Sequence, residues 1–486
     1  MSVLGIDVGT STCKGVVLSA DGKIIKKNSH NYSSKPTIEN NKAYIKAEVF
    51  RDGVFNIISE LALCVKDVDP IESLAISTHG ETLILTDANG NALSPAILSM
   101  DRRCDEQTRI LKSELGREGF YSICGTPIHT QYPVPKIMWL KKNDKETFNK
   151  AKRYCTVQDY LHGQLGVEFA VDTSLASRFG GFDVNKRVWS DEILSVADID
   201  KNKFSIPVQA GTIIGIIPSK IAKLLNLNDG VKVVAGGHDQ PCAALAMGAV
   251  SGKMTVSAGS YECATIVTDN PLNDKNGFKY GLNSYCHVIP NKYLTLAFFS
   301  SGLMVNWFIE KFCAFARLEE KSVYEVLESL APKNPTGICF TPHVYGSMNP
   351  KWDDNAKAVI SGVTGETGIG HLYRALLEGT ACELNLNLQV LEELSTNINK
   401  VILCGGGTRS DLWMQIRADI LNKPLLRIEG NIDVSCIGAA ILAGIGNQTF
   451  ENYKQAVDKI RYDYTEFLPK NAKGYEQQKL NYSKIS

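Results

Sequence analysis

Two similar hairpins, one at the start of the chain and one near its middle, restrict the fold more than any other feature. In residues 4–25 two apolar strands flank a Gly-Thr turn, and residues 251–268 repeat this form around a Gly-Ser turn. The turn glycines are 250 residues apart, about half of the 486-residue chain. A repeat of this period predicts two similar domains, and the chain is too long for one ordinary core. We expect domains at 1–245 and 246–486.

The turn of the first hairpin is suited to bind phosphate. It offers the backbone N–H groups and hydroxyls of Gly9, Thr10, Ser11 and Thr12, with Lys14 just beyond. Successive backbone N–H groups in such a turn form a concave site for anions. An ordinary polar hairpin is the alternative.

The carboxylate of Asp7 ends the first strand, where it can hold Mg²⁺ through water. The second hairpin offers a comparable turn at Gly259 and Ser260. Two such turns that face each other across a cleft could clamp one polyphosphate.

The segment from Val233 to Val250 places a carboxylate at a helix start. A buried strand runs into Asp239 and Gln240, and Pro241 is expected to be the first helical residue. The positive end of the helix dipole should keep Asp239 ionised and able to accept a proton. The alternative is that Asp239 only caps its helix.

Polar residues also follow two other strands of the first half. His79, Gly80 and Glu81 interrupt a hairpin, and Asp101 and Arg102 follow a short apolar strand. Such groups at strand ends suit a ligand with several hydroxyls. The alternatives are a structural histidine and a solvated charge pair.

A third glycine turn follows the strand at 401–407 of the second half. Gly405, Gly406 and Gly407 leave the backbone open to a flat ring or a phosphate. A tight strand-to-helix turn is the alternative. The chain contains neither a G-x-G-x-x-G nor a P-loop motif, so those nucleotide folds are not supported.

Composition excludes several classes of protein. Lys plus Arg and Asp plus Glu each number 52, so no basic field favours nucleic acid or an anionic membrane. The most apolar segment, 293–309, contains polar residues that disfavour a membrane span. The N-terminal residues do not have the pattern of a signal peptide. The 13 cysteines are scattered without C-x-x-C spacing, which indicates reduced thiols in a cytoplasmic protein.

These motifs, in this order, resemble those of the FGGY carbohydrate kinases, a family with the actin, Hsp70 and hexokinase-like fold. The resemblance runs from the first strand to about residue 445. IDVGTSTCK and SAGSYE are similar to the two phosphate motifs, and THGETLILTDANGNALSPAILSMDRR is similar to the sugar-binding region. YPVPKIMWL is similar to the family signature, GGHDQ to the segment with the catalytic aspartate, and CGGGTRSDLWMQIRADILNKPL to the adenosine motif.

The resemblance implies an α/β fold of two ribonuclease-H-like domains with a cleft between them. ATP and Mg²⁺ would lie mostly on the second domain and the sugar on the first. Asp239 would accept the proton of the sugar hydroxyl, and Asp7 would hold Mg²⁺, largely through water. A homodimer is the oligomer to test for.

The remaining implied site residues fall into two groups. The sugar would contact His79, Gly80, Glu81, Asp101, Arg102 and Gln240. The nucleotide would contact Gly9, Thr10, Ser11, Thr12, Lys14, Gly259, Ser260, Gly405, Gly406, Gly407 and Asp411.

The segments that resemble the family do not agree on one substrate. His79-Gly80 is similar to a segment of xylulokinases, whereas Glu81-Thr82 and Asp239-Gln240 are similar to segments of glycerol kinases. Thr78 stands where xylulokinases have methionine, Gly80 stands where glycerol kinases have arginine, and Gln131 stands where glycerol kinases have an aromatic residue. A ketose such as xylulose is the best single guess. The alternatives are glycerol, another polyol or a sugar acid, and, from another class, an Hsp70- or actin-like ATPase.

Overall fold

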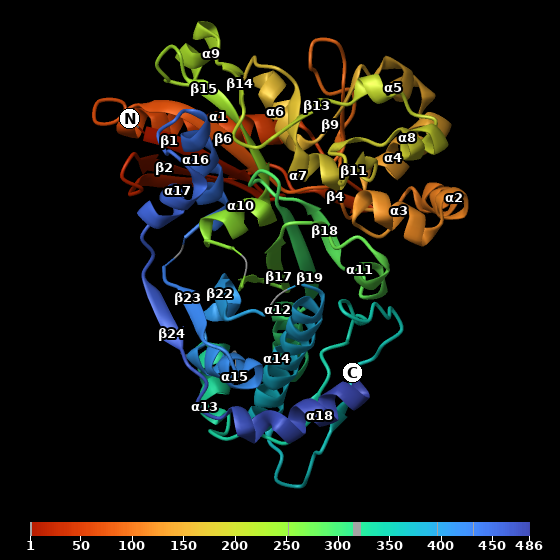
Figure 1. The fold of residues 1–486 in the computed structure, drawn as a ribbon, viewed down its shortest axis with the longest axis vertical. Helices are drawn as coiled ribbons and strands as arrows, with labels where there is room; N and C mark the ends of the chain where they lie inside the picture. Colours follow the sequence, from red (N-terminus) through yellow and green to blue (C-terminus); the bar gives the residue numbers. More distant parts are fainter. Residues whose placement is uncertain (1, 251, 314–321, 396, 431) are drawn as a thin grey trace.

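Two sheets with the same strand pattern form the frame of the protein (Figure 1). The computed structural model describes residues 2–250, 252–313, 322–395, 397–430 and 432–486, so Ser251 of the second hairpin lies outside the described residues. The first sheet has the order β14 (Ile213–Ile216), β15 (Lys232–His238), β6 (Ile71–Thr78), β1 (Ser2–Val8), β2 (Thr12–Ser19), β3 (Ile24–Asn31). The second has the order β18 (Asn283–Cys286), β19 (Tyr293–Ser300), β17 (Tyr261–Thr268), β16 (Lys253–Ala258), β22 (Lys400–Cys404), β23 (Leu425–Ile428), β24 (Tyr464–Phe467).

Strand directions repeat between the sheets. In the first, β1 pairs antiparallel with β2 and parallel with β6, and β6 pairs parallel with β15. In the second, β16 stands in the same relation to β17 and β22, and β22 pairs parallel with β23. This agreement confirms the predicted two-domain α/β fold. The division between residues 245 and 246 stays a prediction.

The central strands are covered on both faces, as parallel strands require. On one face of the first sheet lies α1 (Glu48–Val65), which buries Phe50, Val54, Ile57 and Leu61 at helical spacing. On the other face lies α16 (Val434–Gly446), which packs against β1 and β6. The first sheet is therefore completed by a helix from the C-terminal part of the chain.

Two helices rich in small residues join the domains. α10 (Asp239–Ala246) packs closely against α16 through alanines and glycines such as Ala243 and Gly438. α10 begins at Asp239, two residues earlier than the sequence predicts, so Pro241 is its third residue. The opposite end of α10, at Leu245, borders a cavity of about 710 Å³.

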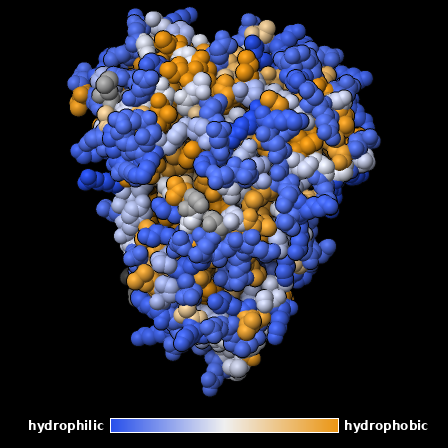
Figure 2. Space-filling model, viewed as in Figure 1, coloured by the Kyte–Doolittle hydropathy of each residue, from blue (hydrophilic) through white to orange (hydrophobic). Residues whose placement is uncertain are grey.

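The molecular surface is mainly hydrophilic. In Figure 2 apolar residues gather at the waist between the broad half that holds the first sheet and the narrower half that holds the second. Across the described ranges, no helix combines the length and the hydropathy that a membrane span needs.

Candidate functional site

Three parallel strands of the first sheet end side by side. Val8 lies opposite Thr78, and Thr78 lies opposite His238. The residues that follow them, Gly9, His79 and Asp239, therefore leave the same edge of the sheet. In this way the topology brings together three predicted segments that are far apart in the sequence.

The second sheet repeats this arrangement. Ser257 of β16 lies opposite Cys404 of β22, so the turns at Gly259 and Gly405 leave one edge. Gly405 has a φ of +103°, and a Cβ there would lie 2.5 Å from the carbonyl oxygen of Ala258. Only glycine fits this close approach.

An ion pair joins two residues that are far apart in the sequence. The Lys14 Nζ of β2 lies 2.6 Å from the Asp433 Oδ1. Asp433 directly precedes α16, and nothing in its local sequence pointed to this partner. The predicted phosphate-binding lysine thus has a carboxylate partner at the start of the helix that covers the first sheet.

Asp239 is a half-buried carboxyl group at the first position of α10. Its Oδ1 has no hydrogen-bond partner among the residues that the structure describes. The His238 Nε2 lies 3.1 Å away but lacks the alignment of a hydrogen bond. Asp239 thus keeps a buried acceptor oxygen without a donor among the described residues.

The protonation of Asp239 differs from the expectation. Burial, followed by the nearby carboxylates of Asp7 and Glu81, raises the pKa of Asp239 to about 8. The helix dipole was expected to keep this group ionised, and that prediction is wrong because desolvation and like charges outweigh it. A pKa near neutrality suits a general base.

Asp7 offers one carboxylate to a cation. It accepts a hydrogen bond from the Ser77 hydroxyl at 3.1 Å, and burial raises its pKa to about 6. No group of three or more metal-ligating side chains occurs in the described part of the chain. One carboxylate fits Mg²⁺ that is held mainly by water and phosphate oxygens.

His79 is fixed by the protein itself. Its Nδ1 lies 2.9 Å from the Val8 carbonyl oxygen, and its Nε2 lies 2.9 Å from the Thr82 hydroxyl. Both ring nitrogens are thus used, so the histidine supports the strand end rather than offering a free nitrogen to a ligand.

Glu81 pairs with an arginine that sequence reasoning missed. Arg178 donates its Nε to the Glu81 Oε1 at 2.6 Å and its Nη1 to the Asn283 Oδ1 at 3.2 Å. The guanidinium lies over the rings of Tyr132 and Tyr285. Burial disfavours the charge of Glu81, yet Arg178 holds the pKa of this carboxyl below its usual range. Glu81 has a φ of +61°, a strained conformation that is common at functional sites.

The other predicted sugar-site residues differ in exposure. Asp101 is fully buried, and its carboxylate accepts from the Ala43 N–H and from Arg103, so this carboxylate supports the backbone instead of facing the sugar as predicted. Arg102 is exposed, and Gln240 is half-buried. A Cβ on Gly80 would lie 3.1 Å from the His238 Nε2, so glycine leaves room for that ring.

The nucleotide segments are tied together by a buried ion pair. Glu262 of β17 and Arg417 of α15 (Asp411–Leu421) are in contact, and each side chain is 1% exposed. The Arg417 Nη1 also donates to the Gly407 carbonyl oxygen at 3.0 Å. This pair connects the strand after the Ser260 turn to the glycine loop.

The remaining predicted phosphate and nucleotide residues lie on the surface of the turns. Ser11, Gly259, Ser260 and Gly406 are exposed, while Thr10 and Thr12 are half-buried. Asp411 is largely exposed and pairs with Arg427 at 2.6 Å.

Comparisons with known proteins agree with this geometry. Sequence profiles of the FGGY family of carbohydrate kinases match this chain, the N-terminal domain at residues 2–246 and the C-terminal domain at 254–446. A gluconokinase of Bacillus subtilis (strain 168) is 26% identical over 95% of this chain and 91% of that protein. A xylulose kinase of the same strain is 26% identical over 96% of this chain and 93% of that protein. The crystal structure of xylulose kinase from Rhodospirillum rubrum has the same fold, with a TM-score of 0.90 at 22% identity over 100% of this chain and 98% of that chain.

Proposed function

Because the chain belongs to the FGGY family of carbohydrate kinases, we propose that Asp239 is the base of its ATP-dependent sugar phosphorylation. The sugar hydroxyl oxygen bonds to the γ-phosphorus of ATP, its proton passes to Asp239, and ADP leaves with the bridging oxygen. The observation that carries this proposal is the unpartnered Oδ1 of Asp239, at the edge shared with the Gly9 turn. Since phosphoryl transfer depends mainly on alignment and charge neutralisation, a carboxylate held at this edge is sufficient as a base.

The nucleotide would lie between the two glycine turns. We propose that backbone N–H groups of the Gly9 and Gly259 turns hold the phosphates and that the loop at Gly405 holds the adenosine. Asp7 would hold Mg²⁺ through water, and the bound cation would neutralise triphosphate charge. Sugar and ATP are the proposed ligands, and a cytoplasmic homodimer is the proposed form of the protein.

For the substrate we propose a neutral ketose, with xylulose as the best single candidate. The Arg178 guanidinium is already neutralised by Glu81, so this buried cation does not call for an anionic sugar. A sugar acid is the second candidate because the exposed Arg102 could meet a carboxylate, and a gluconokinase is among the relatives. ADP release measured with pentuloses, hexuloses, polyols and gluconate would decide among them. Equal ADP release without any sugar would instead favour an Hsp70- or actin-like ATPase.

Glu81→Gln should change the preference among sugars. The substitution keeps the shape of Glu81 but leaves the buried Arg178 charge uncompensated, so an anionic sugar gains relative to a neutral one. We expect the kcat/KM ratio of gluconate to xylulose to rise about tenfold, within the 1–3 kcal/mol typical of an altered buried contact, while the KM for ATP stays constant. Glu106→Gln, which alters an exposed carboxylate paired with Lys142, is the control. An equal change in kcat/KM for every sugar would show that Glu81 does not discriminate among substrates.

Binding of both ligands should close the two domains. Lys14 pairs with Asp433 and can exchange this partner for a phosphate. Small-angle scattering of Asp239→Asn with ATP, Mg²⁺ and sugar should give a smaller radius of gyration than either ligand alone, because closure excludes water. The variant avoids turnover during the measurement. An unchanged radius at saturation would contradict a hinged clamp.

A further inference from the structure

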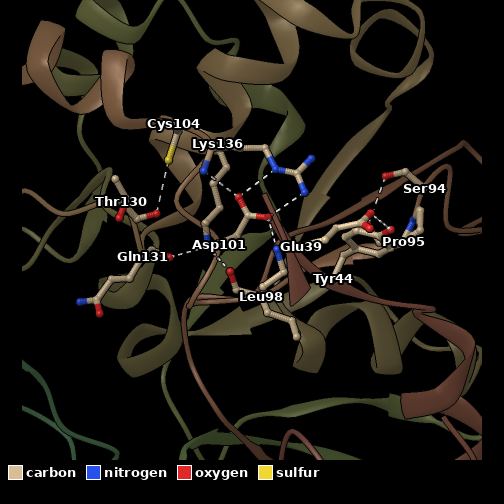
Figure 3. A network of polar contacts seen from close by, with 12 residues as sticks. Glu39, Tyr44, Ser94, Pro95, Leu98, Asp101, Cys104, Thr130, Gln131 and Lys136 are labelled. Carbon is tan, nitrogen blue, oxygen red and sulfur yellow. Dashed lines mark hydrogen bonds and ion pairs between the residues drawn. The ribbon is translucent and has the colours of Figure 1, made fainter. Parts of the chain in front are cut away.

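The buried side chain of Lys136 joins three segments of the first domain. Lys136 lies in α4 (Pro133–Asn143) and is 0% exposed. Its Nζ donates to the carbonyl oxygens of Glu81, Leu98 and Gln131 at 3.1, 2.7 and 2.6 Å, and Figure 3 shows the last two. An ammonium group has three donors, so all of them are used.

Two of these segments, at Glu81 and Gln131, lead to the proposed sugar site. The Glu81 side chain pairs with Arg178. Gln131 directly precedes Tyr132, whose ring lies 5.3 Å from the Arg178 guanidinium. The Leu98 carbonyl oxygen also accepts a hydrogen bond from the Asp101 N–H, and the Asp101 carboxylate accepts from Arg103. The lysine is therefore the point at which the backbones around the Glu81–Arg178 pair meet.

Burial of a charged lysine at this position is energetically unfavourable. Burial lowers the pKa of Lys136 to about 8, against the opposing effects of Cys104, Asp101 and Glu81. None of its three hydrogen bonds is to a carboxylate, and an ammonium taken out of water without a bonded counter-ion is strongly disfavoured. An apolar side chain of similar length would avoid this cost but would remove the donor from the three carbonyl oxygens. The hydrogen bonds therefore serve the geometry of the three segments.

We infer that Lys136 is a positioning residue for the sugar site. It holds the backbone at Glu81, Leu98 and Gln131 so that the Glu81–Arg178 pair faces the substrate, and it does not touch the sugar itself. The inference rests on the proposed sugar kinase function. In it, one buried cation maintains the geometry of the site.

The test compares Lys136→Met with Ile137→Ala. Methionine keeps the length and the packing but removes all three donors. Ile137 is the next residue of α4 and is also 0% exposed, so its truncation loosens the same helix without touching the three carbonyl groups. The KM for sugar and the KM for ATP are measured for each variant, with the sugar that the wild type phosphorylates best, and folding is followed by circular dichroism.

We expect Lys136→Met to raise the sugar KM about tenfold or more, the usual effect of leaving a buried polar group unpaired, with the ATP KM within about twofold. Ile137→Ala should lower the melting temperature and leave both KM values unchanged. If Lys136→Met does not fold, Lys136→Gln retains two donors and should show a smaller rise in sugar KM alone. An unchanged sugar KM in a folded Lys136 variant, or an equal rise in Ile137→Ala, would overturn the inference. Absence of sugar phosphorylation by the wild type would overturn the proposed function, and this inference with it.

Discussion

Asp239→Asn lowers kcat by about 10²-fold or more, while the KM for ATP and the melting temperature stay close to wild type. Asparagine keeps the size of the side chain and its place at the first position of α10. It cannot receive the proton of the sugar hydroxyl, so the loss falls on the chemical step. Steady-state kinetics with a coupled assay for ADP measure this effect.

The pH profile separates a base from a helix cap. Because the pKa of Asp239 is raised to about 8, a larger fraction is protonated and inactive at lower pH. In the wild type, kcat/KM should therefore rise with pH up to about 8. In Asp239→Asn, kcat/KM should not show this rise. Asp191→Asn, which changes an exposed carboxylate at the first position of helix α8 (Asp191–Ala197), is the matched control and should change neither quantity. Near wild-type turnover in a folded Asp239→Asn protein would show that Asp239 only caps its helix.

Arg417→Met lowers the free energy of unfolding by about 3–5 kcal/mol, the usual effect of removing one partner from a buried ion pair. Glu262 is 1% exposed, and without Arg417 its charge has only the Ser301 hydroxyl as a partner among the described residues. Urea unfolding followed by circular dichroism measures the loss.

The double variant Glu262→Gln/Arg417→Met tests the cause of this loss. It removes both charges, so it should recover much of the stability. Neither Arg417→Met nor the double variant has a donor to the Gly407 carbonyl oxygen, so both should raise the KM for ATP. A double variant as unstable as Arg417→Met would show that packing around Trp413, rather than the unpaired charge, causes the loss.

Much of the frame could be predicted because its signals are local. The two hairpins and the strand that leads into Asp239 are continuous in sequence, and their repetition predicts the paired sheets. The Glu81–Arg178 and Lys14–Asp433 pairs could not be predicted in this way, because they join residues 97 and 419 positions apart. The protonation of Asp239 was misjudged for a related reason: the helix dipole is a local effect, whereas burial and the Asp7 charge arise only from the tertiary fold.

The packing of α16 against β1 cannot form until almost the whole chain has been synthesised. β1 leaves the ribosome first, but the helix that covers one face of its sheet comes from residues 434–446. At about 5–20 residues per second, roughly 20–90 s separate the two events. During that interval the apolar face formed by residues such as Val3 and Val16 lacks its cover. We therefore expect the nascent N-terminal half of the chain to expose this apolar face until α16 has been made.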